Sequence, residues 1–133
     1  MPKVWVNGSF DVLHLGHVKL LQYASSLGTL KIGIDSDSRI KLRKGVERPF
    51  NTLVERIEFL QSLKFVHDVV SFETDEQLLD LIMGYKPDIL VIGEEYKNNY
   101  IVGKSIFSEI KYFNRVPNKS TTLILNYGKT NSM

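Results

Sequence analysis

The chain has 133 residues, of which 43% are hydrophobic and 24% are charged, and these values are ordinary for one globular domain with a buried core. A formal net charge of +2 gives no indication of a nucleic-acid or membrane partner, and we expect neither a membrane-spanning segment nor a signal peptide. The absence of cysteine excludes disulfides and thiolate chemistry and suits a cytoplasmic protein.

The first 35 residues predict a strand, a helix and a second strand. Val4-Trp5-Val6 is a short apolar segment that runs into a glycine-containing turn, as a buried strand does. From His17 apolar residues recur at three- and four-residue steps until Gly28, where a helix should end. Alternation over residues 30–34 predicts the second strand, which ends at Asp35. A unit of this kind predicts a right-handed crossover and a parallel sheet.

The rest of the chain continues the alternation of strands and helices. Residues 36–51 show no apolar period and carry five cations, so we expect a mobile loop with at most one turn of helix. Thr52 and Glu55 form a capping box that begins the next helix. Further strands are predicted at 66–72, 89–92 and 111–114, and helices at 75–84, near 105–110 and at 120–127.

These elements predict a Rossmann-like, three-layer α/β sandwich with a mainly parallel five-stranded sheet. We expect a single domain over residues 1–127 and a flexible tail over residues 128–133. Ligands of such sheets bind beyond the carboxyl ends of the strands. Loops 7–16, 35–51 and 93–103 should therefore converge on one site.

Two of the three histidines, His14 and His17, lie on either side of Gly16 directly after the first predicted strand. If a helix begins here, both rings project from its first turn toward one point. The amides of a helix N-terminus favour phosphate, and imidazoles add donors that strengthen as charge develops on phosphorus. This arrangement suits displacement at the α-phosphate of a nucleoside triphosphate. The alternative is a histidine that only caps the helix or fills the core, while a zinc site lacks an evident third ligand.

Several segments of the chain resemble known nucleotidyltransferases. The stretch Gly8-Ser9-Phe10-Asp11-Val12-Leu13-His14-Leu15-Gly16-His17 resembles the signature of the cytidylyltransferase-like superfamily. Arg115 followed by Ser120-Thr121-Thr122 is similar to the terminal motif of glycerol-3-phosphate cytidylyltransferases. Seven further segments resemble an adenylyltransferase domain, the one that makes ADP-heptose from heptose 1-phosphate. They are Lys41–Gly45, Arg48–Asn51, Glu55-Arg56, Asp68–Phe72, Pro87–Val91, Gly93–Tyr96 and Ile101–Gly103.

The resemblance implies a role for each of a set of residues. The implied catalytic residues are His14, His17, Lys44 and Arg115. The implied nucleotide-binding residues are Ser9, Phe10, Asp11, Leu15, Gly16, Gly93, Glu94, Ser120, Thr121 and Thr122. Lys44 and Arg56 are the candidates for binding the phosphorylated substrate. No side chain is assigned to a metal, and we expect Mg²⁺ to accompany the triphosphate.

Three of these assignments have a structural alternative. Lys44 lies in a basic loop that could form only a solvated face, although it would lie over the active site. Arg56 is equally compatible with a phosphate contact and a structural ion pair. Asp11 can orient a histidine or a metal-bound water, or it can hold its own turn.

The reaction expected is transfer of AMP or CMP from ATP or CTP to a phosphorylated sugar or polyol, with release of pyrophosphate and no covalent enzyme intermediate. The middle of the chain favours heptose 1-phosphate and ATP, whereas the segment from Arg115 to Thr122 favours glycerol 3-phosphate and CTP. No Lys or Arg occurs between Phe65 and Tyr85, where glycerol-phosphate enzymes tend to use a basic side chain, so we favour the heptose interpretation. The resemblance also implies a homodimer. A nucleotide-binding module without turnover is the alternative from another class.

Overall fold

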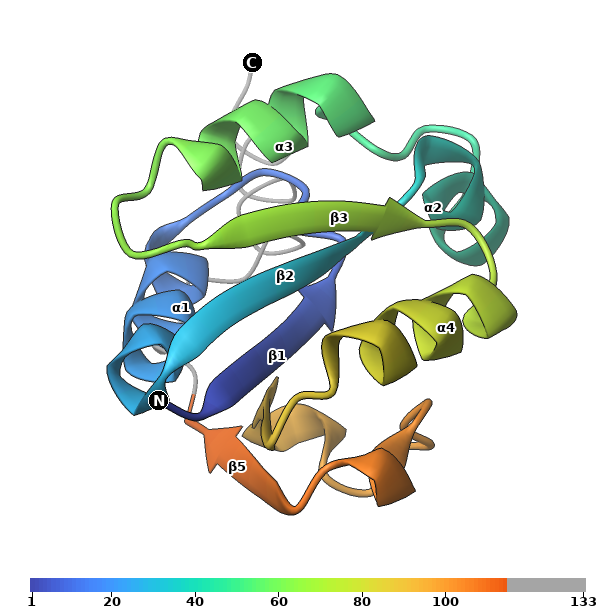
Figure 1. Cartoon of the computed structure of the whole chain (residues 1–133). Helices are drawn as coiled ribbons and strands as arrows, with labels where there is room; N and C mark the ends of the chain where they lie inside the picture. Colours follow the sequence, from blue (N-terminus) through green and yellow to red (C-terminus); the bar gives the residue numbers. More distant parts are fainter. Residues whose placement is uncertain (115–133) are drawn as a thin grey trace.

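The computed structural model describes residues 1–114, which form a five-stranded sheet flanked by helices (Figure 1). All neighbouring strands are parallel, and their order is β3-β2-β1-β4-β5. The predicted parallel sheet is therefore confirmed. The strands are β1 (Lys3–Gly8), β2 (Thr29–Asp35), β3 (Asp68–Phe72), β4 (Ile89–Gly93) and β5 (Glu109–Phe113).

Helices cover the two faces of the sheet and give the three layers. Side chains of α1 (Leu15–Leu27) and α3 (Leu53–Gln61) share one core with alternate residues of β1 and β2, including Val4 and Ile32. On the other face α4 (Asp75–Tyr85) packs on a second core around Trp5, which is fully buried. The period-two alternation of the strands thus sends successive side chains to different layers.

Residues 37–44 form a helix, α2 (Asp37–Lys44), where we predicted a mobile loop with at most one turn of helix. That prediction was wrong because capping residues at its two ends define this helix, whereas it has no apolar stripe that a sequence pattern could reveal. Ser36 caps it by accepting a hydrogen bond from the amide of Arg39 at 3.2 Å, and Gly45 ends it with φ of 105°. Ile40 is the buried residue of this helix.

The predicted capping box of α3 is confirmed, because the side chains of Thr52 and Glu55 each bond the other's backbone amide. The short helix predicted near 105–110 is limited to the 3-10 turn η2 (Lys104–Ile106), and β5 begins two residues earlier than predicted. The pairing of Ile110 with Leu90 explains this difference, since it extends the sheet over that segment. The helix predicted at 120–127 and the tail at 128–133 lie outside the described residues.

Within residues 1–114 no helix is long and apolar enough to cross a membrane. The strand order reverses between β1 and β4, since β2 and β3 lie on one side of β1 while β4 and β5 lie on the other. Such a reversal leaves a crevice beyond the carboxyl ends of the two central strands. The N-terminus of α1 lies at the β1 side of this crevice.

Candidate active site

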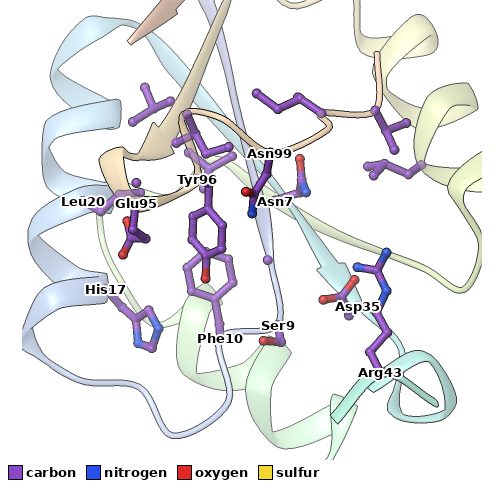
Figure 2. A pocket seen from close by; sticks show the side chains of 18 of the residues that line it. Asn7, Ser9, Phe10, His17, Leu20, Asp35, Arg43, Glu95, Tyr96 and Asn99 are labelled. Atoms are coloured by element: carbon purple, nitrogen blue, oxygen red, sulfur yellow. The ribbon is translucent and has the colours of Figure 1, made fainter. Parts of the chain in front are cut away.

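A pocket of about 710 Å³ lies beyond the carboxyl ends of the strands (Figure 2). It is lined by residues that follow β1, such as Ser9 and His17, residues that follow β2, such as Lys44, and residues that follow β4, such as Tyr96. The three loops predicted to converge do so here. Figure 2 shows His17 and Glu95 on one side of the pocket, with Asp35 and Arg43 on the opposite side.

The two histidines of the sequence motif form the cap of α1. Nδ1 of His14 accepts a hydrogen bond from the amide of Gly16 at 3.0 Å, and Nδ1 of His17 accepts one from the amide of His14 at 3.2 Å. The rings stack with 3.8 Å between their centroids, and the Phe10 ring lies 5.3 Å from that of His17. Both histidines and Gly16 line the pocket, as predicted.

These backbone bonds fix the tautomer of each histidine. An Nδ1 atom that accepts a hydrogen bond carries no proton, so the ring proton of the neutral imidazole lies on Nε2. Nε2 is then the donor atom of each ring, and in His14 this atom is buried, while the other nitrogen holds the start of the helix. The capping alternative and the catalytic hypothesis are therefore compatible, because Nδ1 of each ring caps the helix and Nε2 is the donor.

The turn between Phe10 and Val12 is strained and is held by a buried carboxylate. Phe10 and Val12 have positive φ values of 49° and 56°, which is unfavourable for a β-branched residue. Asp11 between them is 1% exposed and accepts hydrogen bonds of 2.8 Å from the amides of Phe50 and Asn51 and from Nε of Arg48. Burial alone would raise the pKa of Asp11, but these three donors outweigh it and hold the pKa below its ordinary value.

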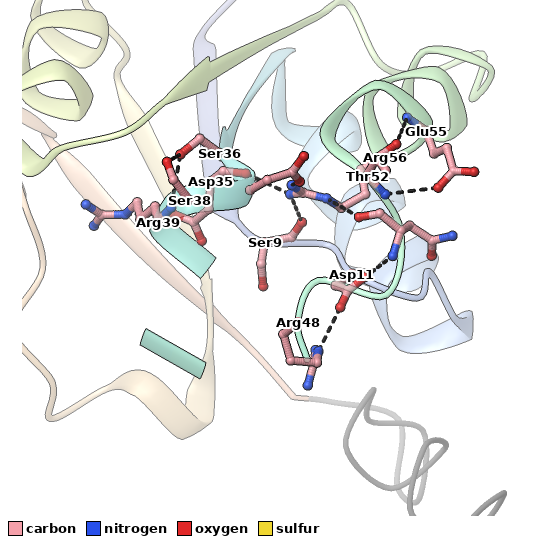
Figure 3. A network of polar contacts seen from close by, with 12 residues as sticks. Ser9, Asp11, Asp35, Ser36, Ser38, Arg39, Arg48, Thr52, Glu55 and Arg56 are labelled. Atoms are coloured by element: carbon pink, nitrogen blue, oxygen red, sulfur yellow. Dashed lines mark hydrogen bonds and ion pairs between the residues drawn. The ribbon is translucent and has the colours of Figure 1, made fainter. Parts of the chain in front are cut away.

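Asp11 therefore fastens the loop after β1 to the loop before α3 (Figure 3). It lies beneath the pocket and is not one of the lining residues, unlike its partner Arg48. Of the roles considered for this carboxylate, the structure shows that it holds the turn, and its partners come from a segment about 40 positions away.

Arg56 is buried, with 1% exposure, and it does not line the pocket. Its guanidinium donates to the carbonyls of Asn51 at 3.0 Å, Ser9 at 2.9 Å and Asp35 at 2.7 Å, and to the carboxylate of Asp37 at 2.6 Å (Figure 3). Of the two alternatives for Arg56, the structure shows the ion pair. One side chain thus joins the ends of β1 and β2 to the start of α2 and of α3.

Lys44 lies where the sequence placed it, over the pocket. Its Nζ donates a hydrogen bond to Oγ of Ser9 at 2.9 Å. The residue as a whole is exposed, but its ammonium group lies against the pocket wall. This burial, together with the nearby charge of Arg48, lowers the pKa of Lys44 from its ordinary value.

In the part of the pocket wall that follows β4, the carboxylate comes from a residue one position later than predicted. Gly93 lines the pocket, but the carboxylate beside it belongs to Glu95, whereas Glu94 does not line the pocket. The 3-10 turn η1 (Glu94–Tyr96) decides which of the two side chains faces inward. A Cβ on Gly93 would overlap Oε1 of Glu95, so the absence of a side chain at position 93 makes room for this carboxylate.

Other lining residues were missed by the sequence interpretation. They include Asn7, Arg39, Arg43, Asp75, Tyr96 and Asn99. The loop 93–103 was expected to reach the site, but nothing in its sequence distinguished Tyr96 and Asn99 from ordinary loop residues. Leu15, a predicted contact, is 48% exposed and does not line the pocket. The predicted residues Arg115, Ser120, Thr121 and Thr122 lie outside the described part of the chain.

Comparison with known proteins agrees with this geometry. The model of the cytidylyltransferase-like family matches residues 5–126, and the chain belongs to this family. It is 47% identical over 123 residues to the bifunctional protein HldE of a Nitratiruptor species, a match that covers 92% of this chain and 26% of that protein. It is 44% identical over 124 residues to the bifunctional protein HldE of Campylobacter fetus subsp. fetus, covering 92% and 27%. The chain thus spans about a quarter of the length of these relatives.

The fold also occurs in a solved structure, that of a lipopolysaccharide core biosynthesis protein from Thermoplasma volcanium. The TM-score is 0.72, and the match covers 87% of this chain and 98% of that one. The two sequences are 24% identical, so the likeness concerns the fold alone. The family and the Rossmann-like fold predicted from the sequence are both confirmed.

Proposed function

We propose that this protein is a nucleotidyltransferase that transfers AMP from ATP to a sugar 1-phosphate of the heptose type and releases pyrophosphate. The observation that carries the proposal is the pair of stacked histidines that cap α1, each with Nδ1 used by the backbone and its proton on Nε2. Lys44 and Arg48 add positive charge to the same pocket. The arrangement offers donors and cations to a triphosphate.

The chemistry that this site supports is a direct displacement. An oxygen of the acceptor phosphate forms a bond to the α-phosphorus of the nucleotide, while the bond from that phosphorus to the bridging oxygen breaks and pyrophosphate leaves. The acceptor phosphate is ionised near neutral pH and requires no general base. Catalysis then depends on positioning and on stabilising the charge that develops on the phosphoryl oxygens.

The histidines and Lys44 divide this task between two sides of the pocket. The imidazoles donate from the N-terminus of α1, where the first amides of the helix add their own positive potential. Lys44, bonded to Ser9, brings an ammonium from the end of α2. A phosphoryl group between them would have donors from both elements.

Magnesium fits this site as a partner of the triphosphate rather than as an ion held by the protein alone. Among the described residues no group of three or more His, Cys, Asp and Glu side chains could hold a metal. Mg²⁺ commonly uses substrate phosphates and only one or two carboxylates, and on the side of His17 the pocket offers Glu95 (Figure 2). When bound, the ion would neutralise part of the triphosphate charge.

The choice of acceptor rests on the relatives. The heptose-type segments named in the sequence lie in the part of the chain that aligns with two proteins called HldE at 44–47% identity. Transfer of CMP from CTP to glycerol 3-phosphate is the second candidate, favoured by the spacing from Arg115 to Ser120. A homodimer and a cytoplasmic location stay predictions.

The test is to incubate the protein with Mg²⁺, with either ATP or CTP, and with heptose 1-phosphate, mannose 1-phosphate or glycerol 3-phosphate, and to measure pyrophosphate. Release with ATP and a sugar 1-phosphate is expected. Release only with CTP and glycerol 3-phosphate would select the second candidate. No release with any pair, from a protein that still binds nucleotide, would indicate the module without turnover.

A further inference from the structure

Two side chains on one face of the sheet reach the pocket from the ends of β1 and β2. Along β1, Asn7 follows Trp5 by two residues, so it points to the same face, toward α4. Along β2, Asp35 follows Gly33 by two residues, and a Cβ on Gly33 would meet the Trp5 ring, so Asp35 also points to this face. The histidines instead come from α1, which packs on the opposite face.

An arginine holds Asp35 and a second carboxylate in place. Nε of Arg39 donates to Oδ1 of Asp35 at 2.9 Å, and its Nη2 donates to Oδ1 of Asp75, the first residue of α4, at 2.6 Å. The guanidinium also lies over the Phe72 ring, 5.1 Å from its centroid, and its side chain is only 10% exposed. All three charged residues line the pocket.

The hydrogen-bonding groups left for a ligand follow from these contacts. Each carboxylate uses Oδ1 for Arg39, and within residues 1–114 no hydrogen bond is recorded to Oδ2 of Asp35 or of Asp75. Oδ1 of Asn7 accepts from the indole Nε1 of Trp5 at 3.0 Å, which fixes the amide and leaves its NH₂ group as a donor. The α4 face therefore presents fixed acceptors and a fixed donor.

The charges at this end of the pocket are balanced. Asp35 and Asp75 are both paired with Arg39, and Arg43 lies on the same side of the pocket as Asp35 (Figure 2), so two carboxylates face two guanidinium groups. Hydroxyl groups suit such a surface, because each hydroxyl can donate to a carboxylate and accept from an amide. A quaternary ammonium would need an aromatic cage, whereas the two arginines here already neutralise both carboxylates.

From this geometry we infer that Asn7, Asp35 and Asp75 form the subsite that recognises the hydroxyl groups of the acceptor sugar. The inference rests on the proposed function and assigns the two substrates to different faces of the sheet. The triphosphate lies over the N-terminus of α1, and the sugar ring lies on the side of α4. Arg39 is a positioning residue that holds both carboxylates.

Two isosteric substitutions test the subsite. Asp75→Asn replaces an acceptor oxygen with a donor, and Asn7→Asp keeps the bond from Trp5 while replacing the donor with an acceptor. For the sugar 1-phosphate that the wild type uses best, we expect kcat/KM to fall about 10- to 100-fold in each variant, as for loss of a hydrogen bond to a charged group. With methyl phosphate, which carries no hydroxyl groups, we expect kcat/KM to stay within about 3-fold of wild type.

The control is Glu76→Gln, which removes a neighbouring charge from the same first turn of α4 but does not line the pocket. We expect it to leave both acceptors unaffected, and thermal unfolding should show that all three variants are folded. An equal loss with methyl phosphate, or a raised KM for the nucleotide, would mean that Asp75 and Asn7 only support the structure and would overturn the inference. A wild-type protein that prefers phosphocholine to sugar phosphates as the acceptor would also overturn the inference.

The failure of the subsite can be distinguished from the failure of the proposed function. A wild-type protein that releases pyrophosphate with a sugar 1-phosphate, but whose Asp75→Asn and Asn7→Asp variants keep full kcat/KM, rejects the subsite alone. A wild type that releases none with any acceptor rejects the proposed function and the subsite with it.

Discussion

Nζ of Lys44, the last residue of α2, lies 2.9 Å from Oγ of Ser9 in the loop that follows β1. This bond joins the basic segment after β2 to the segment that carries both histidines. Any phosphate that enters between them meets an ammonium, a hydroxyl and the capped end of α1 within one pocket. The contact makes Lys44 the first residue to test.

Replacing Lys44 by alanine should remove one charged donor from the transferring phosphoryl group. We expect kcat to fall about 10²- to 10³-fold, as it does when one preorganised donor is lost elsewhere. Pyrophosphate release measures the effect. Lys41→Ala is the matched control, because Lys41 is exposed on the same helix and does not line the pocket. Equal activity in the two variants would exclude a catalytic role for Lys44.

The lowered pKa of Lys44 predicts a pH effect. Because this pKa lies below the ordinary 10.5, the ammonium loses its proton earlier as pH rises, and activity should decline on the alkaline side. In Lys44→Arg the guanidinium stays charged throughout, so the alkaline decline of kcat/KM should move to higher pH. An identical alkaline limb in both proteins would assign the titration to another group.

Substitutions that keep the helix cap can separate the two functions of the histidines. His14→Asn retains a side-chain acceptor for the amide of Gly16, and His17→Gln retains the third residue of a capping box, but neither keeps the Nε2 donor. We expect both variants to melt close to the wild type and to lose about 10²- to 10³-fold in kcat. His14→Ala should lose activity and also about 1 kcal/mol of stability.

The informative comparison is between the alanine and asparagine variants at position 14. If His14→Asn retained near-normal turnover, the ring would matter only as a cap, and the proposed mechanism would fail. Circular dichroism and thermal unfolding give the stability of each variant independently of activity.

Asp11→Asn should destabilise the protein, because it removes the charge that three donors share and places an NH₂ group against them. We expect a loss of about 2 kcal/mol in the free energy of unfolding at pH 7. The pKa of Asp11 is lowered in the folded state, so its contribution is present above the unfolded value near 3.8 and is lost as pH falls through the folded value. The difference between wild type and variant should therefore shrink below about pH 4 in urea titrations. A constant difference across this range would contradict the assignment.

The sheet, most of its helices and the convergence of three loops could be predicted because local patterns determine them. The apolar steps after His17 and the alternation over residues 30–34 are such patterns. The helix α2 could not be predicted in this way, since Ile40 alone is buried in it and Ser36 and Gly45 set its ends.

The position of the two histidines at the start of a helix followed from the motif, and that of Lys44 followed from the predicted convergence of the loops, whereas the supporting contacts could not be predicted. Asp11 and Arg56 bond mainly to main-chain atoms of distant segments. Because main-chain groups are common to nearly all residue types, the sequence does not indicate which residues provide these partners. The choice of Glu95 over Glu94 depends on a single 3-10 turn. Such details depend on contacts between distant segments and on the geometry of single turns, which local sequence patterns do not determine.

The bonds of Arg56 have a consequence for how this protein can change over evolutionary time. Three of its partners are the carbonyl oxygens of Ser9, Asp35 and Asn51, which every amino acid would supply equally well. These bonds therefore do not depend on which side chains the bonded segments present to the substrates. Related proteins can exchange those side chains and use new acceptors, while the same arginine continues to hold the segments in place.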